Sequence, residues 1–172
     1  MSETILFIVE PCPLGYLLAA ATADGLRAVW LGDSAAELAA ARAVALPSAR
    51  REDADSRLNA WTASLQAYLR GEQPSLDLPL DLAATPFQRR VWQALQAIPY
   101  GSTRTYSQVA QAIGQPAAAR AVASACAANP VALVVPCHRV VREGGGLSGY
   151  RWGLPRKRAL LEMEAAQQAL SL

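Results

Sequence analysis

Residues 129–141 read NPVALVVPCHRVV, and within this stretch Cys137 is followed directly by His138, the one histidine of the chain. Pro136 stiffens the backbone before the pair, and the flanking residues are apolar enough to belong to a core. Two interpretations are open from these residues alone. The segment is a buried strand with an inert cysteine and a hydrogen-bonded core histidine, or it presents a thiol that a neighbouring base activates as a nucleophile.

The second interpretation needs more than adjacency in sequence. Successive side chains point to opposite faces of a strand and diverge by about 100° in a helix, so direct contact between Cys137 and His138 is awkward. Proton transfer would need a bridging water or a bend at Pro136, and the histidine would need a carboxylate to orient it. Residues 86–172 contain three candidates for that carboxylate: Glu143, Glu162 and Glu164.

The composition is that of a folded protein with one good-sized domain or two lobes. Of the 172 residues, 52% are hydrophobic and 17% are charged, which excludes a disordered chain. No run approaches the roughly 18 apolar residues of a membrane span, and the N-terminus lacks the basic region of a signal peptide. We therefore expect a cytoplasmic protein that does not associate with membranes.

The cysteines indicate neither a disulfide framework nor a metal site. Cys12, Cys126 and Cys137 are odd in number and widely spaced, unlike the cysteines of small secreted proteins. A structural zinc ion needs about four ligands, which would use every cysteine and histidine of the chain. We expect no metal, and we assign no catalytic role to Cys126.

Charge is segregated along the chain. Residues 1–85 hold 6 arginines and 11 acidic residues, a net −5, whereas residues 86–172 hold 10 basic and 3 acidic residues, a net +7. A basic half is the pattern expected of a protein that binds a polyanion. Ordinary solvated surface charge is the alternative, but the segregation favours nucleic acid.

The first half of the sequence predicts a mixed α/β lobe. Strands are expected at residues 5–10, 16–22 and 25–32, with a hairpin turn at 23–25. An alanine-rich helix follows at 34–45, capped by Asp33 or Ser34. A second helix is expected at 56–71, with a buried face made by Leu58, Trp61, Leu65, Tyr68 and Leu69. The proline-rich segment 72–86 is a connector, so we predict domains at 1–80 and 85–172.

The second half predicts helices at residues 85–98, 105–114, 117–129 and 155–170. Thr85 is a candidate N-cap, and Thr105 with Gln108 forms a capping box. The helices at 105–114 and 117–129, joined by a tight turn, fit a helix-turn-helix. The many alanines of the latter let it pack against another helix or enter a narrow DNA groove with Arg120 projecting, and spacing alone favours packing.

These motifs together resemble the O6-alkylguanine-DNA alkyltransferases, the methylated-DNA–protein-cysteine methyltransferases. Pro-Cys-His-Arg at 136–139 is the active-site signature of that family, and the resemblance extends over residues 85–166. The stretches RAVASACAAN and LSGYRWG look closest to the C-terminal domain of bacterial Ada. The resemblance implies an α/β fold: a small RNase H-like lobe followed by a mostly helical lobe with a winged helix-turn-helix-like DNA-binding motif.

The resemblance also implies residue roles. Cys137 is the alkyl acceptor, His138 deprotonates it through a water molecule, and Glu164 orients His138. Asn129 braces the active-site turn, and Tyr106 contacts the flipped base and its phosphate. Arg120 is the finger that fills the space left by that base. The other expected DNA contacts are Ser107, Ala119, Ala123 and Arg139. The lid of the guanine pocket comprises Ser148, Gly149, Tyr150, Arg151 and Trp152, and the bulk of Trp152 is expected to narrow the pocket and favour methyl groups.

The implied activity is direct-reversal DNA repair. The protein would flip O6-alkylguanine out of double-stranded DNA through the minor groove and transfer the alkyl group irreversibly to Cys137, acting once, without a cofactor and as a monomer. O4-alkylthymine is a further candidate substrate. Two alternatives remain open: a non-repairing module that binds alkyl damage, and a cysteine hydrolase that turns over. A sequence-specific regulator is disfavoured because residues 117–129 offer few side chains that read bases.

Overall fold

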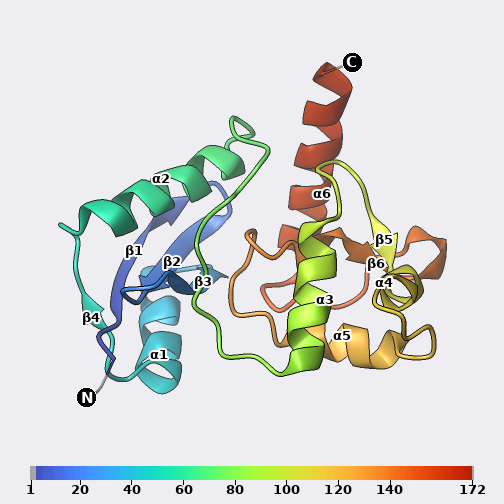
Figure 1. Cartoon of the computed structure of the whole chain (residues 1–172). Helices are drawn as coiled ribbons and strands as arrows, with labels where there is room; N and C mark the ends of the chain where they lie inside the picture. Colours follow the sequence, from blue (N-terminus) through green and yellow to red (C-terminus); the bar gives the residue numbers. More distant parts are fainter. Residues whose placement is uncertain (1–2, 172) are drawn as a thin grey trace. The chain divides into compact units, whose positions relative to one another are not determined.

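The computed structural model describes residues 3–171, which divide into two compact units (Figure 1). Of the described residues, unit 1 comprises 3–82 together with Pro130–Ala132, and unit 2 comprises 83–129 and 133–171. No described helix is long and apolar enough to cross a membrane.

Unit 1 is built on a four-stranded sheet with strand order β3-β2-β1-β4. The strands are β1 (Leu6–Cys12), β2 (Gly15–Ala21), β3 (Leu26–Gly32) and β4 (Arg50–Arg51). The first three form an antiparallel meander, and β4 pairs parallel to β1. Pro130–Ala132 covers the open edge of β3, because Val29 donates to the carbonyl of Pro130 and accepts from the amide of Ala132.

Gly25 is required in the turn between β2 and β3. Its φ is +157°, and a Cβ atom at this position would lie 2.7 Å from the carbonyl carbon of Pro79. That close approach allows the amide of Leu26 to donate to the oxygen of Pro79 at 2.8 Å, which fixes the connector to the sheet.

Two helices pack against this sheet, α1 (Ala35–Ala45) and α2 (Ser56–Leu69). Ser34 caps α1 and Asp55 caps α2, because each side chain accepts a hydrogen bond from an amide of the first turn. The expected buried face of α2 is correct except at Trp61. That ring is only partly buried, and the Arg57 guanidinium lies 4.9 Å above its centroid.

Unit 2 is mostly helical. Its helices are α3 (Pro86–Gln96), α4 (Tyr106–Ala112), α5 (Ala119–Ala127) and α6 (Leu154–Leu170), with two-residue strands β5 (Arg104–Thr105) and β6 (Val140–Val141). Capping boxes start both α3 and α4, at Thr85 with Gln88 and at Thr105 with Gln108. Helices α3, α4 and α5 pack on one another, and α4 and α5 form the expected helix-turn-helix.

The stretch around Pro136 is not a strand. Cys137–Arg139 forms one 3-10 turn, after which β6 pairs parallel to β5. Leu133, just upstream, has a φ of +74°, the one positive value of a non-glycine residue among those that the structure describes. A left-handed conformation costs a leucine about 1–2 kcal/mol, so packing around this buried side chain must hold the backbone there.

Candidate active site and DNA-binding surface

The Cys137 thiol lies at the start of the 3-10 turn and is almost fully buried. Asn129, which follows α5, donates from Nδ2 to the carbonyl of Val135 at 2.8 Å and to Cys137 Sγ at 3.3 Å. Burial raises the pKa of the thiol from its ordinary 9.0 to about 11, although the Asn129 bond and the charges of Lys157 and Arg151 oppose that shift. At neutral pH the thiol therefore keeps its proton, and nucleophilic attack requires a base.

His138 points the other way, toward α6. Its Nε2 lies 2.7 Å from Oε2 of Glu164, and both side chains are at most 1% exposed. Burial lowers the pKa of His138, against the opposing effect of Glu164, so the imidazole is neutral at pH 7. Since the carboxylate accepts the Nε2 hydrogen, Nδ1 is the ring nitrogen that can accept a proton.

Glu164 accepts hydrogen bonds from other groups besides His138. Arg139 donates to both carboxylate oxygens, at 2.9 Å and 3.1 Å, and the amide of Gly101 donates at 3.1 Å. Arg139 also donates to the carbonyl of Ile98 at 2.8 Å. The prediction that Arg139 contacts DNA is therefore wrong, because its guanidinium is buried and its donors are used inside the protein.

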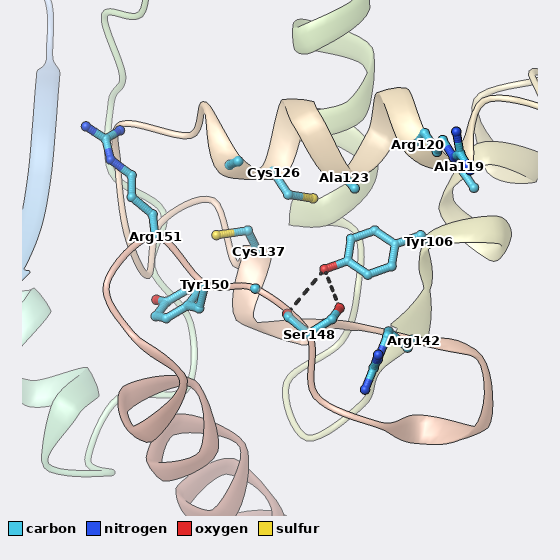
Figure 2. Close-up of a pocket in the computed structure, with 12 residues that line it drawn as sticks. Tyr106, Ala119, Arg120, Ala123, Cys126, Cys137, Arg142, Ser148, Tyr150 and Arg151 are labelled. Carbon is cyan, nitrogen blue, oxygen red and sulfur yellow. Dashed lines mark hydrogen bonds between the residues drawn. The ribbon is translucent and has the colours of Figure 1, made fainter.

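A pocket of about 590 Å³ opens beside the thiol, and Figure 2 shows its lining. The lining side chains come from α4, α5, the 3-10 turn and the loop before α6: Tyr106, Ala119, Arg120, Ala123, Cys126, Ala127, Cys137, Arg142, Ser148, Gly149, Tyr150 and Arg151. The lining includes three arginines and no carboxylate, so the pocket favours a ligand with negative charge at its edge.

Tyr106 and the loop at Ser148 are joined within this pocket. Ser148 Oγ donates to the Tyr106 hydroxyl at 3.1 Å, and the hydroxyl in turn lies 3.5 Å from the Ser148 carbonyl, to which it donates. Burial raises the pKa of Tyr106, which keeps the phenol protonated and able to donate a hydrogen bond.

Lys157, in α6, forms hydrogen bonds with the same loop. It is fully buried, and its Nζ donates to the carbonyls of Val140, Ser148 and Gly149 at 2.7, 2.8 and 3.3 Å. Sequence reasoning missed this residue. A signal was present, since Lys157, Leu160 and Glu164 are spaced i, i+3, i+7 and therefore share one face of α6.

Family models match nearly the whole chain. The ribonuclease-like domain of the 6-O-methylguanine DNA methyltransferases matches residues 5–82, and their DNA binding domain matches residues 86–166. The crystal structure of Mycobacterium tuberculosis O6-methylguanine methyltransferase is similar, with a TM-score of 0.81 and 38% identity over 95% of this chain and 94% of that chain. The chain belongs to the O6-methylguanine DNA methyltransferase family.

Curated relatives of this methyltransferase family member agree. The "Bifunctional transcriptional activator/DNA repair enzyme Ada" of Escherichia coli is 46% identical over 94% of this chain and 46% of its own length. The "Methylated-DNA--protein-cysteine methyltransferase" of Mycobacterium tuberculosis is 53% identical over 63% of this chain and 66% of its own. The chain thus spans about half the length of the Ada relatives it matches. The expected family and fold class are confirmed.

The structure of this methyltransferase family member does not bring every predicted residue into the pocket. Trp152 is buried but does not line it, and its ring packs edge-on against Tyr150 with centroids 5.3 Å apart. That its bulk narrows the pocket and favours methyl groups stays a prediction, and any such effect would be transmitted through Tyr150, which lines the pocket. Ser107 is partly buried outside the lining. Conversely, Cys126, Ala127 and Arg142 line the pocket without having been predicted there.

Proposed function

We propose that the protein repairs alkylated DNA by transferring a methyl or other alkyl group from O6-alkylguanine in double-stranded DNA to Cys137, once per molecule. The observation that carries this proposal is a buried thiol that opens into a pocket and is followed by a neutral histidine bound to a carboxylate. The family membership supports the same reaction. O4-alkylthymine is a second candidate lesion.

The proposed step begins with loss of the thiol proton. A water molecule carries the proton from Cys137 to Nδ1 of His138, and the Glu164 carboxylate stabilises the imidazolium that forms. The thiolate then attacks the alkyl carbon in line with the bond to O6, and that bond breaks with its electron pair going to the guanine. Tyr106 donates a hydrogen bond to the leaving base, which regains a proton from His138 through solvent.

This chemistry explains a single turnover. The product is a thioether, which offers no carbonyl for water to attack, so the sulfur is not regenerated. The step balances with the thiol and the lesion alone, and the proposal therefore invokes no cofactor and no metal.

The DNA would be bound through α5. Ala119 and Ala123 are small enough for this helix to enter a minor groove closely, and Arg120 is exposed at the pocket edge. We propose that Arg120 fills the space of the extruded base, that Ser107 lies near the backbone, and that a monomer carries out the repair. Extrusion costs less for an alkylated guanine because it pairs poorly.

The test is an intact-mass and peptide-mass measurement. The protein is incubated with a duplex carrying one O6-methylguanine, first in equimolar amount and then in excess. We expect one added methyl group on the peptide containing Cys137 and repair that stops at one lesion per protein. Cys137→Ser should transfer nothing, whereas the matched control Cys126→Ser should still react. Repair with turnover would indicate a hydrolase, and binding without a mass change would indicate a damage-binding module.

A further inference from the structure

Arg142 lies beside Tyr106 at one end of a small parallel sheet. In β5 and β6, Thr105 is in register with Val141, so Tyr106 and Arg142 are the next residues on the two paired segments. Both line the pocket that contains Cys137. The backbone of Arg142 is fixed by two hydrogen bonds, from its amide to the carbonyl of Gly146 and from the amide of Gly145 to its own carbonyl, each 2.9 Å long.

The guanidinium of Arg142 has no partner in the part of the chain that the structure describes. The residue is exposed, and among residues 3–171 no group accepts a hydrogen bond from its side chain or forms an ion pair with it. Its head lies over Gly146, where an added Cβ would be 3.6 Å from Nε and Nη2. A cation on a fixed base, at the edge of a pocket that no described carboxylate lines, is available to an anionic ligand.

Arg151, unlike Arg142, has partners for its guanidinium within the protein. Figure 2 shows Arg151 and Arg142 on opposite sides of Cys137 and Tyr106. Arg151 already donates to the carbonyl of Asn129 at 2.9 Å and lies 5.4 Å over the ring of Trp152. Of these two arginines, Arg142 is the one whose donors are unused.

We propose that Arg142 binds a backbone phosphate that flanks the extruded nucleotide. The inference rests on the proposed function, because a nucleotide rotated into the pocket brings its two flanking phosphates to the pocket edge. The planar guanidinium matches two phosphate oxygens at once. The positive charge of Arg142 also acts on the neighbouring phenol, where it opposes the burial that raises the pKa of Tyr106.

The test is a cycle of one protein variant and one DNA change. Single-turnover methyl transfer is measured over a range of duplex concentrations, with an ordinary O6-methylguanine duplex and with duplexes in which the phosphate on the 5′ or the 3′ side of the lesion is a neutral methylphosphonate. Wild type should need about tenfold more of one neutral duplex to reach half its maximal rate, as expected for one charge-assisted contact. Arg142→Ala should need about tenfold more of the ordinary duplex than wild type does to reach half its maximal rate. The neutral duplex should not raise that concentration further in Arg142→Ala, because the contact is already absent.

Two further variants sharpen the result. Arg142→Lys keeps a charge that can reach phosphate and should recover most of the affinity, whereas Arg158→Ala removes an exposed arginine outside the pocket and should change the half-saturating concentration less than twofold. The maximal rate of Arg142→Ala should stay near that of wild type. The contact would be overturned if the affinity losses caused by Arg142→Ala and by the neutral phosphate multiplied when combined. It would also be overturned if Arg158→Ala lost as much affinity as Arg142→Ala, or if Arg142→Ala lowered only the maximal rate. If wild type transfers no methyl group at all, the proposed function fails first and this inference fails with it.

Discussion

At the residue scale, Glu164 joins the three groups that shape the active site. It accepts hydrogen bonds from His138, Arg139 and the amide of Gly101 while buried in α6. We predict that Glu164→Gln lowers the free energy of unfolding by about 3 kcal/mol, because it leaves the Arg139 charge buried without a counter-ion. Alkyl transfer should slow as well. Chemical denaturation and single-turnover assays measure both effects.

The same helix offers a matched control. Glu162 is exposed, so Glu162→Gln should change stability by no more than about 0.5 kcal/mol and leave transfer unaffected. Equal effects of the two substitutions would contradict the role given to Glu164.

The burial of the Cys137 thiol should be visible in the pH dependence of its rate of chemical modification. Because burial raises its pKa to about 11, the rate of modification by iodoacetamide, followed on the Cys137 peptide, should rise about tenfold per pH unit from pH 8 to 10. Asn129→Ala should move the profile to still higher pH, since the Asn129 bond lowers this pKa. A plateau beginning near pH 9 would show an ordinary, solvated thiol.

The raised pKa of Cys137 also determines whether the free energy of unfolding rises or falls with pH. Below the ordinary value of 9.0 the folded and unfolded states both hold the proton, and from 9.0 to about 11 only the unfolded state releases it. The contribution of this group is therefore fully present below pH 9 and is lost as the pH rises through that window.

At the element scale, α6 carries the support for the pocket loop. Its buried Lys157 holds the carbonyls of Ser148 and Gly149, which contribute to the pocket lining. We predict that Lys157→Met raises hydrogen exchange of the amides at residues 147–151 by about tenfold or more, because the carbonyls lose a charged donor. The exposed neighbour provides a control, since Arg158→Met should leave these amides unchanged. Unaltered exchange in Lys157→Met would refute this role.

At the scale of the whole molecule, the charge asymmetry should govern the encounter with DNA. Residues 86–172 carry a net +7 and residues 1–85 a net −5, so attraction to phosphate is concentrated in the part of the chain with the pocket. We predict that the transfer rate at low duplex concentration falls between 50 and 200 mM salt by about tenfold for every two phosphates contacted. Transfer from free O6-methylguanine base serves as the control, because the base carries no phosphate. An equal salt dependence for duplex and base would contradict this prediction.

Much of the molecule could be predicted from local patterns. Short apolar runs and a hairpin turn located β1 to β3, periodic apolar residues located the main helices, and capping residues such as Ser34, Thr85 and Thr105 marked helix starts. The Pro-Cys-His-Arg motif directed attention to Cys137. These features depend on residues within a few positions of one another, so a single sequence contains them in full.

The errors concern side chains whose surroundings come from elsewhere in the chain. Cys137, His138 and Arg139 lie on one 3-10 turn, in which successive residues diverge by about 120°. The thiol therefore faces the pocket, while the imidazole and the guanidinium meet Glu164, which lies 26 and 25 positions further along the chain. Whether Arg139 reaches DNA, whether Trp152 lines the pocket and whether Lys157 is buried were decided by packing between distant segments. Residue type and local spacing are enough to specify a helix or a motif. Which partner a side chain contacts is decided only when distant segments of the chain pack together.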